Sequence, residues 1–364
     1  MNMSKLIVIF LFACISCNNQ DAGKGNKTTG DTFASSVTCE NTPSRFVADK
    51  VAPEGMKWIP GGNFFMGTDD RESYLPEQPA HPVHVNGFYI DITEVTNSQF
   101  KKFAEATGYV TIAEQKPEWE QLKKQLAPGT PKPDDKELVP ASLVFVAPLS
   151  STSLDDYSQW WQWVHGANWK HPEGPGSDIS DRMNHPVVHI AYDDALAYCK
   201  WAKKRLPTEA EWEFAARGGL AQKRYAWGDD FKCNGHYMAN TFQGRFPDKE
   251  SSEDGYLRTA PVKSYPPNGY GLYDMIGNAW EWCSDWYDAG YFKTLDKTKT
   301  QQNPTGPAKC YDPDEPYALK RVTKGGSFLC SDNYCRNFRP SARRGTAYDS
   351  GASNTGFRCV MDGK

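Results

Sequence analysis

The fold and the chemistry of this chain are decided by Lys324-Gly-Gly-Ser-Phe-Leu-Cys330-Ser-Asp-Asn-Tyr-Cys335-Arg-Asn-Phe-Arg339. Four residues separate the two cysteines, and the Gly-Gly-Ser turn before them lets both sulfurs meet. As thiolates, Cys330 and Cys335 suit a soft cation of low coordination number, and Cu(I) is the biologically common one. The same spacing also permits a short-loop structural disulfide, so the residues alone leave both interpretations open.

Charge around this cysteine pair favours thiolate over thiol, because several arginines follow closely and positive charge stabilises the anionic form. The residues are Arg336, Arg339, Arg343 and Arg344. The eight cysteines beyond residue 17 contain no C-x-x-C pair, so neither a zinc ribbon nor a thioredoxin-like site is indicated.

The N-terminus has the pattern of an export signal. Lys5 precedes the apolar run 6–13, which is too short for a membrane-spanning helix, since that needs ~20 apolar residues. Ile15-Ser-Cys17 resembles a bacterial lipoprotein box, which would make Cys17 the lipidated first residue of the mature chain. An ordinary signal peptide cleaved near Cys17 is the alternative. Residues 1–17 are therefore predicted to direct export to the bacterial cell envelope or periplasm, with a lipid anchor holding the protein to a membrane.

Composition predicts a tether followed by one large domain. Residues 18–45 have too little apolar surface to offset their ordering entropy, so they are predicted to be flexible. The chain contains 12 Trp, 18 Tyr and 18 Phe, which gives residues 46–364 enough apolar surface for a large core. With 30 Gly and 25 Pro, a mixed α/β, loop-rich fold with little regular secondary structure is expected. A net charge of −4 without a basic run argues against nucleic acid as a partner.

Short-range patterns predict the regular elements. Helices are expected to start at Thr96, after Asp193 and at Thr208, where Thr96 and Thr208 each begin a capping box. Residues 56–67 and 81–90 each predict two short strands. Residues 114–156 are expected to be loop with at most one short helix.

Acidic and amide side chains gather in turn-prone sequence between residues 240 and 281. Calcium takes six to eight oxygens and mixes carboxylates with backbone carbonyls of irregular loops. Spacing alone favours capping, turn and surface roles over calcium binding for these side chains, which are Asn240, Asp254, Asp274 and Glu281. The close histidine pairs have no third metal ligand nearby and are predicted to be structural; they are His81 with His84 and His185 with His189.

Together with Ser353-Asn-Thr-Gly-Phe-Arg-Cys359, the opening stretch resembles the active-site end of formylglycine-generating enzymes. The resemblance covers nearly everything from Met56 to about Met361. It implies that family's loop-rich α/β fold, distantly similar to C-type lectins. Further blocks match in family order: Ile59-Pro-Gly-Gly-Asn-Phe-Phe-Met-Gly-Thr-Asp-Asp70, Gly166-Ala-Asn-Trp-Lys-His-Pro-Glu-Gly174, Lys204-Arg-Leu-Pro-Thr-Glu-Ala-Glu-Trp-Glu213 and Gly277-Asn-Ala-Trp-Glu-Trp282.

The resemblance implies a copper-dependent oxidase. Cys330 and Cys335 would bind Cu(I), and a cysteine in a Cys-x-Pro-x-Arg motif would be oxidised by O2 to Cα-formylglycine. The partners would be unfolded or nascent sulfatase polypeptides, and the protein would act as a monomer. Ser327, Trp280 and Tyr334 match residues that line the reactive centre in the family, and Arg343 and Asn354 match its substrate groove.

The resemblance also implies two structural calcium ions and a disulfide between Cys199 and Cys359. The ligands of the first calcium would be Asn240, Thr241, Asp254 and Tyr256, and those of the second Asp274, Gly277, Ala279 and Glu281. Cysteines outside these sets could form two further bridges of undetermined pairing: Cys39, Cys233, Cys283 and Cys310. The chain departs from the family in a longer 286–320 stretch and in Asp274, where some relatives have Asn.

Three other functions compete with this interpretation. A non-catalytic surface lipoprotein with a structural, secretion or motility role would typically lack the copper thiols. An iron-dependent sulfoxide synthase would need a histidine-rich iron site, which this chain does not offer. A lectin-like glycan-binding module would need an open calcium site, whereas the implied calcium positions are internal.

Overall fold

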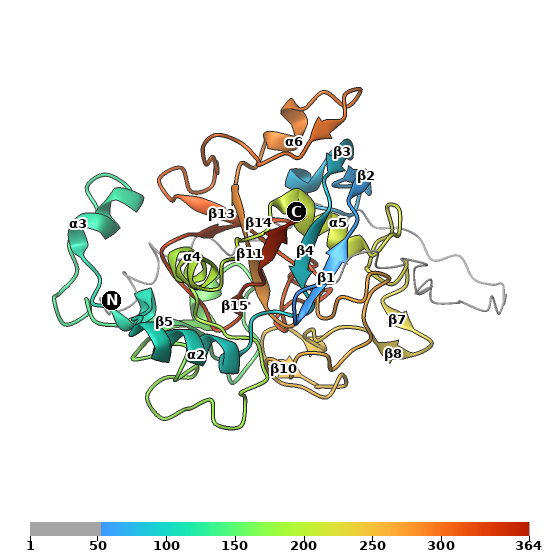
Figure 1. Ribbon diagram of the computed structural model, residues 1–364. Coiled ribbons are helices and arrows are strands. Elements are labelled where there is room, and N and C mark those ends of the chain that lie inside the picture. Colours follow the sequence, from blue (N-terminus) through green and yellow to red (C-terminus); the bar gives the residue numbers. More distant parts are fainter. Residues whose placement is uncertain (1–51, 364) are drawn as a thin grey trace.

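The computed structural model describes residues 52–363 (Figure 1). The predicted signal 1–17, the lipidation site Cys17, the tether 18–45 and Cys39 lie outside these residues and stay predictions. Between residues 52 and 363, no helix is long and apolar enough to cross a bilayer.

Short strands joined by long loops make up most of the described chain. The helices are α2 (Asn97–Thr107), α3 (Trp119–Leu122), α4 (Tyr192–Trp201), α5 (Glu209–Arg217) and α6 (Tyr291–Thr294). The strands are β1 (Met56–Ile59), β2 (Gly62–Met66), β3 (His81–Val85), β4 (Phe88–Asp91), β5 (Ala141–Phe145), β6 (Trp161–His165), β7 (Lys232–Cys233), β8 (His236–Tyr237), β9 (Gly244–Arg245), β10 (Lys249–Glu250), β11 (Trp280–Trp286), β12 (Gln301–Gln302), β13 (Lys320–Lys324), β14 (Arg344–Ala347), β15 (Thr355–Gly356) and β16 (Val360–Asp362).

Four strands form the central sheet, in the order β14-β13-β11-β15 (Figure 1). β13 runs antiparallel to both β11 and β14, whereas β15 is parallel to β11. Helix α5 packs against β11 and β13, and the ring of Tyr192 at the start of α4 lies edge-on to Trp282 of β11. The sheet therefore forms a rigid frame between the two helices.

The strands predicted at residues 56–67 and 81–90 form, but the two strands within each segment do not pair with each other. β1 pairs with β4 and β2 with β3, both antiparallel, and β4 and β3 also pair with β16 and β12. The connection at Gly61 lies against the connection between β3 and β4: a Cβ on Gly61 would stand 2.4 Å from the Val85 carbonyl oxygen. This close approach sends the two pairs of strands into separate sheets.

Two helix starts were predicted from capping boxes, and both are confirmed. The Thr96 hydroxyl accepts a hydrogen bond from the Gln99 backbone amide, and the Gln99 side-chain oxygen accepts one from the Thr96 backbone amide. Thr208 and Glu211 do the same for α5. Gly108 ends α2 with a left-handed φ of 68°. The prediction of loop for residues 114–156 is wrong in part, because this segment contains strand β5 besides α3.

Aromatic side chains dominate the core. The larger cluster includes Trp160, Trp212 and Trp280 and extends to Cys330 and Cys335. A second cluster is formed by side chains of α2 and α4 together with Phe357. It includes Phe100, Phe103 and Tyr198. The paired cysteines thus lie in the larger of two packed interiors.

Candidate active site

One end of the central sheet collects most of the predicted active-site residues. β13 ends at Lys324, and its antiparallel neighbour β11 starts at Trp280, so the two positions are adjacent. β15 starts beside Trp280 because it is parallel to β11, which brings Asn354 to the same end. The 325–343 loop between β13 and β14 carries the cysteines and therefore begins and ends there.

The two cysteines of the opening stretch meet in this loop. Their sulfurs lie 3.0 Å apart, and both cysteines are buried and not disulfide-bonded. The turn between them is closed by bonds from the Ser331 amide to the Cys335 carbonyl, 3.1 Å, and from the Tyr334 amide to the Ser331 carbonyl, 3.3 Å. The Phe242 amide also donates to the Cys330 carbonyl, 2.9 Å. The loop is thus fixed to its surroundings on both sides of the thiols.

A wall of aromatic rings stands beside the thiols. Tyr334 stacks on Phe246 with ring centroids 4.6 Å apart, and Trp160 meets Tyr334 edge-on at 5.6 Å. Phe145 and Phe242 extend the wall through contacts with Phe246. These rings belong to the same buried cluster as the two cysteines, whose burial leaves the sulfurs little access to water.

Ser327 and Asn354 are joined directly. The Asn354 side-chain amide donates to the Ser327 hydroxyl at 3.0 Å, and the Leu329 amide donates to the same oxygen at 3.3 Å. The Trp280 amide in turn donates to the Asn354 carbonyl, 2.8 Å. The structure therefore brings together five of the predicted residues with Asn354: Ser327, Trp280, Cys330, Tyr334 and Cys335.

The arginines expected to favour thiolates are largely engaged elsewhere. Arg339 forms a two-pronged ion pair with Glu77, at 2.6 and 2.8 Å, and Arg343 forms one with Glu209, at 2.7 and 2.9 Å. Burial lowers the pKa of both guanidinium groups, but their carboxylate partners raise it, and the net shift is upward. Arg343 is completely buried, so in this conformation its side chain is not open to a substrate, and its place in a substrate groove stays a prediction.

The first predicted calcium site offers an oxygen that fits a cation. The side-chain oxygen of Asn240 is buried without a hydrogen-bond partner, while its amide nitrogen donates to the Arg258 carbonyl at 2.8 Å. Asp254 lies beside it, accepting from the Thr241 amide at 3.0 Å, and burial raises the pKa of the Asp254 carboxyl. A divalent cation would satisfy the unpaired oxygen and the buried charge together.

The second predicted calcium site lies among three buried carboxyls and one arginine. Arg358 binds both oxygens of Glu281 at 2.7 Å, and Glu94 lies 4.0 Å from the same guanidinium. Burial raises the pKa of Asp274 to about 6, and burial together with Asp274 raises that of Glu94 well above its usual value. One arginine cannot neutralise three carboxylates, so the residues present fit a divalent cation.

Glu94 is the residue that sequence reasoning missed. One of its carboxylate oxygens is buried without a hydrogen-bond partner, and the other accepts from Asn278 at 3.0 Å. The Asn278 side-chain oxygen accepts from Asn240 at 3.1 Å, so Asn278 links the two predicted calcium sites. Glu94 lies two residues before the N-cap Thr96, and nothing in its spacing distinguishes it from an ordinary acid near a helix N-terminus.

No three His, Cys, Asp or Glu side chains within residues 52–363 gather closely enough to hold a metal by themselves. The predicted copper site uses two thiols, and each predicted calcium site combines few carboxylates with amide and backbone oxygens. The histidines predicted to be structural are hydrogen-bonded: His189 contacts the Ser142 hydroxyl and the Pro172 carbonyl, both at 2.8 Å, and His185 contacts Thr259 at 3.1 Å.

The remaining cysteines divide into three groups. Cys199 and Cys359 are unbonded with sulfurs 3.4 Å apart, so the structure brings them together and the disulfide stays a prediction. Cys233 is disulfide-bonded. The expected bridges through Cys283 and Cys310 are wrong, because both are free thiols. Cys283 is enclosed in β11, where burial raises its pKa, and Cys310 accepts a bond from the Lys320 amide at 3.2 Å.

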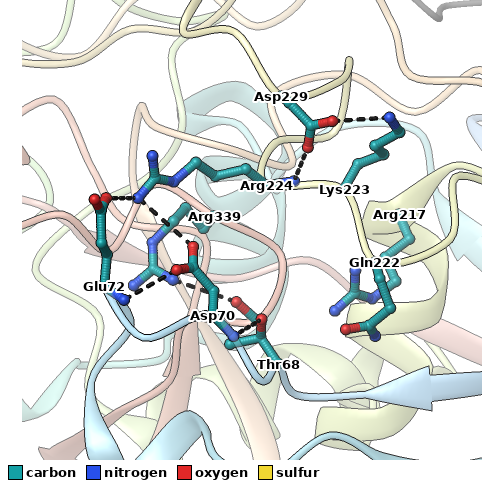
Figure 2. Close-up of a pocket in the computed structure, with 10 residues that line it drawn as sticks. Thr68, Asp70, Glu72, Arg217, Gln222, Lys223, Arg224, Asp229 and Arg339 are labelled. Carbon is teal, nitrogen blue, oxygen red and sulfur yellow. Dashed lines mark hydrogen bonds and ion pairs between the residues drawn. The ribbon is translucent and has the colours of Figure 1, made fainter.

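A charged pocket of about 320 Å³ is lined by Arg339 and by residues of the 68–72 and 217–229 segments (Figure 2). Its charges are matched in pairs, Arg224 with Asp70 and Glu72, and Lys223 with Asp229. The pocket is lined by none of the predicted catalytic residues. Its matched charges and the absence of a thiol make it a poor candidate for the active site.

The comparisons with known proteins show the family of this chain. A sequence model of the sulfatase-modifying factor enzyme 1-like domain matches residues 43–363. The formylglycine-generating enzyme of Thermomonospora curvata is 47% identical over 311 residues, which cover 85% of this chain and 94% of that protein. The chain therefore belongs to the sulfatase-modifying factor family, and the predicted family is confirmed.

Two further comparisons concern catalytic activity and the fold. The inactive C-alpha-formylglycine-generating enzyme 2 of Bos taurus is 37% identical over 314 residues, covering 84% of this chain and 87% of that protein. The structure of PvdO from Pseudomonas aeruginosa has a TM-score of 0.52 at 22% identity and covers 84% of this chain and 94% of that one. PvdO confirms the mixed, loop-rich fold, and the inactive relative shows that family membership alone does not establish catalysis.

Proposed function

We propose that this protein oxidises a cysteine of a sulfatase polypeptide to Cα-formylglycine and thereby activates the sulfatase. The observation that carries the proposal is the pair of buried cysteines, Cys330 and Cys335, which are not disulfide-bonded and whose sulfurs lie 3.0 Å apart at the end of the central sheet. The formylglycine-generating enzymes of Thermomonospora curvata and Streptomyces coelicolor, 47% and 44% identical, support it. Because inactive relatives exist, the thiol pair rather than the fold is the criterion for catalytic activity.

We propose Cu(I) as the cofactor, with Cys330 and Cys335 as its ligands. When bound there, the ion would supply the activation of O2. A metal ion needs more room than the 3.0 Å between the sulfurs, so binding requires the 331–334 turn to open slightly. Two soft, buried thiols suit a soft monovalent ion better than a hard divalent one.

The other site residues prepare the substrate and exclude water. The Ser327 hydroxyl already accepts two hydrogen bonds, from Asn354 and Leu329, so its own hydrogen is available to donate to a substrate group. The stacked rings of Tyr334 and Phe246 leave little room for water beside the sulfurs. An extended Cys-x-Pro-x-Arg segment of an unfolded sulfatase is the proposed substrate, with O2 as the co-substrate and a monomer as the acting form.

The test incubates the copper-loaded protein in air with a peptide that contains a Cys-x-Pro-x-Arg motif. We expect the mass loss that corresponds to replacing CH2SH by CHO at the cysteine, and trapping of the product by an aldehyde reagent. A peptide with serine in place of the cysteine is the control. Failure of the folded, copper-loaded protein to produce any aldehyde would reject the proposed function.

We further propose two structural calcium ions, at Asn240 with Asp254 and at Asp274 with Glu281. Removing calcium with a chelator is expected to lower the thermal midpoint, because bound ligand stabilises the folded state by about 2.7 kcal/mol per site at 100 times its dissociation constant. Thermal unfolding monitored by circular dichroism measures the effect. Added Ca²⁺ should restore the midpoint and Mg²⁺ should not, since Mg²⁺ gives up its water reluctantly. A thermal midpoint that stays the same after the chelator is added would contradict the calcium proposal.

A further inference from the structure

The two thiols of the active site are not equivalent. The Asn337 side-chain amide donates a hydrogen bond to the Cys335 sulfur at 3.2 Å. Among the described residues, the Cys330 sulfur has no hydrogen-bond partner besides Cys335. Asn337 is 4% exposed, so water does not readily replace its amide. The Cys335 sulfur therefore accepts a hydrogen bond from a side-chain amide, and among the described residues the Cys330 sulfur does not.

The fold holds Asn337 in place through its backbone. Gly326, one residue before Ser327, has a left-handed φ of +75° and lies directly against residues 337 and 338. A Cβ at Gly326 would stand 3.1 Å from the Asn337 carbonyl carbon and oxygen. The start of the cysteine loop and the backbone of the residue that bonds to Cys335 are thus packed against each other, which fixes the position of the Asn337 backbone.

We infer that Asn337 is a positioning residue of the copper centre, which stabilises and orients the Cys335 sulfur as the anchored one of the two ligands. This inference rests on the proposed function. An N–H donor to a buried sulfur stabilises its anionic, metal-binding form and restricts its direction, as other hydrogen bonds to metal ligands do. Cys330, which has no such donor, is the ligand that adjusts when the metal enters or the substrate arrives.

The test compares Cu(I) affinity, measured by competition with a chromophoric Cu(I) chelator, in the wild type and in Asn337→Asp and Asn337→Leu. Asp keeps the shape but replaces the donor by an acceptor, and Leu removes the polar group. We expect about 10- to 100-fold weaker binding in both variants, the usual loss when a group supporting a metal ligand is removed. Asn86→Asp is the control, because Asn86 is exposed in the connection between β3 and β4, and its backbone amide donates to the Asn303 side chain rather than to the cysteine loop.

The outcomes separate this inference from the proposed function. If the wild type binds Cu(I) and both Asn337 variants bind it equally tightly, Asn337 has no positioning role while the copper site stands. If the wild type binds no Cu(I), both are overturned. The near-ultraviolet absorption of the thiolate–copper complex gives a second measure: it should shift in Asn337→Asp, since a sulfur without its donor is richer in electrons, and stay unchanged in Asn86→Asp.

Discussion

Replacing either Cys330 or Cys335 by serine is expected to abolish formylglycine formation. The two sulfurs provide the only protein ligands proposed for Cu(I), and a hydroxyl is a poor ligand for a soft ion. Removing a group that only supports a metal ligand costs 10- to 100-fold, so loss of a ligand itself should reduce the rate by at least about 100-fold. The measurement is aldehyde formation in the Cys-x-Pro-x-Arg peptide together with the copper content of each variant.

Serine is close in size to cysteine, so folding should survive both changes. Cys330 and Cys335 are 1% and 8% exposed, and thermal unfolding of each variant provides the check. Cys310→Ser is the matched control, because that thiol lies outside the site and is only partly buried. Full activity in either active-site variant would contradict the copper role. Retained copper with lost activity would instead assign the missing thiol to a later step.

The second large effect is expected from Arg358→Leu. The Arg358 guanidinium is completely buried, binds both oxygens of Glu281 at 2.7 Å and donates to the Tyr273 carbonyl at 3.0 Å. Glu94 and Asp274 raise the pKa of Arg358, which shows that all three carboxyls act on the same cation. Removing one partner of a buried ion pair typically costs about 3–5 kcal/mol, because the other charge is left without compensation. We expect a loss of this size, measured by urea unfolding.

Calcium should offset part of this loss, since a divalent cation can neutralise the carboxyls that Arg358 leaves behind. Arg358→Lys should fall between the wild type and Arg358→Leu, because lysine keeps the charge but not the two-pronged geometry. Lys101→Ala is the control: it breaks an exposed pair with Glu105, whose side chains are 48% and 66% exposed, and the urea midpoint should not move. An unchanged midpoint in Arg358→Leu would show that the carboxyls are neutralised without this arginine.

Features that depend on residues close in sequence were predictable. The helix starts at Thr96 and Thr208 follow from bonds between residues three positions apart, which form whatever the rest of the chain does. The two active-site thiols could be paired because a short turn holds them within reach. The family resemblance rests on short blocks of the same kind, and the fold it implied is confirmed.

Features that depend on distant residues were not predictable. The arginines after Cys335 indicated thiolate stabilisation, but Arg339 binds Glu77, 262 positions away, and Arg343 binds Glu209, 134 positions away. The pairing of the strands was not predictable either, because β1 pairs with β4 and β2 with β3, both of which lie in the later 81–91 segment.

The sequence by itself determined the helix starts, the paired thiols, the family and the mixed, loop-rich fold. The tertiary structure alone decided which charges face one another, that Glu94 joins the buried carboxyls and that Asn337 donates to Cys335. The physical reason is that hydrogen bonds within a turn are set by local geometry. The ionisation and partners of a buried group depend instead on whatever the fold brings within a few ångströms of it.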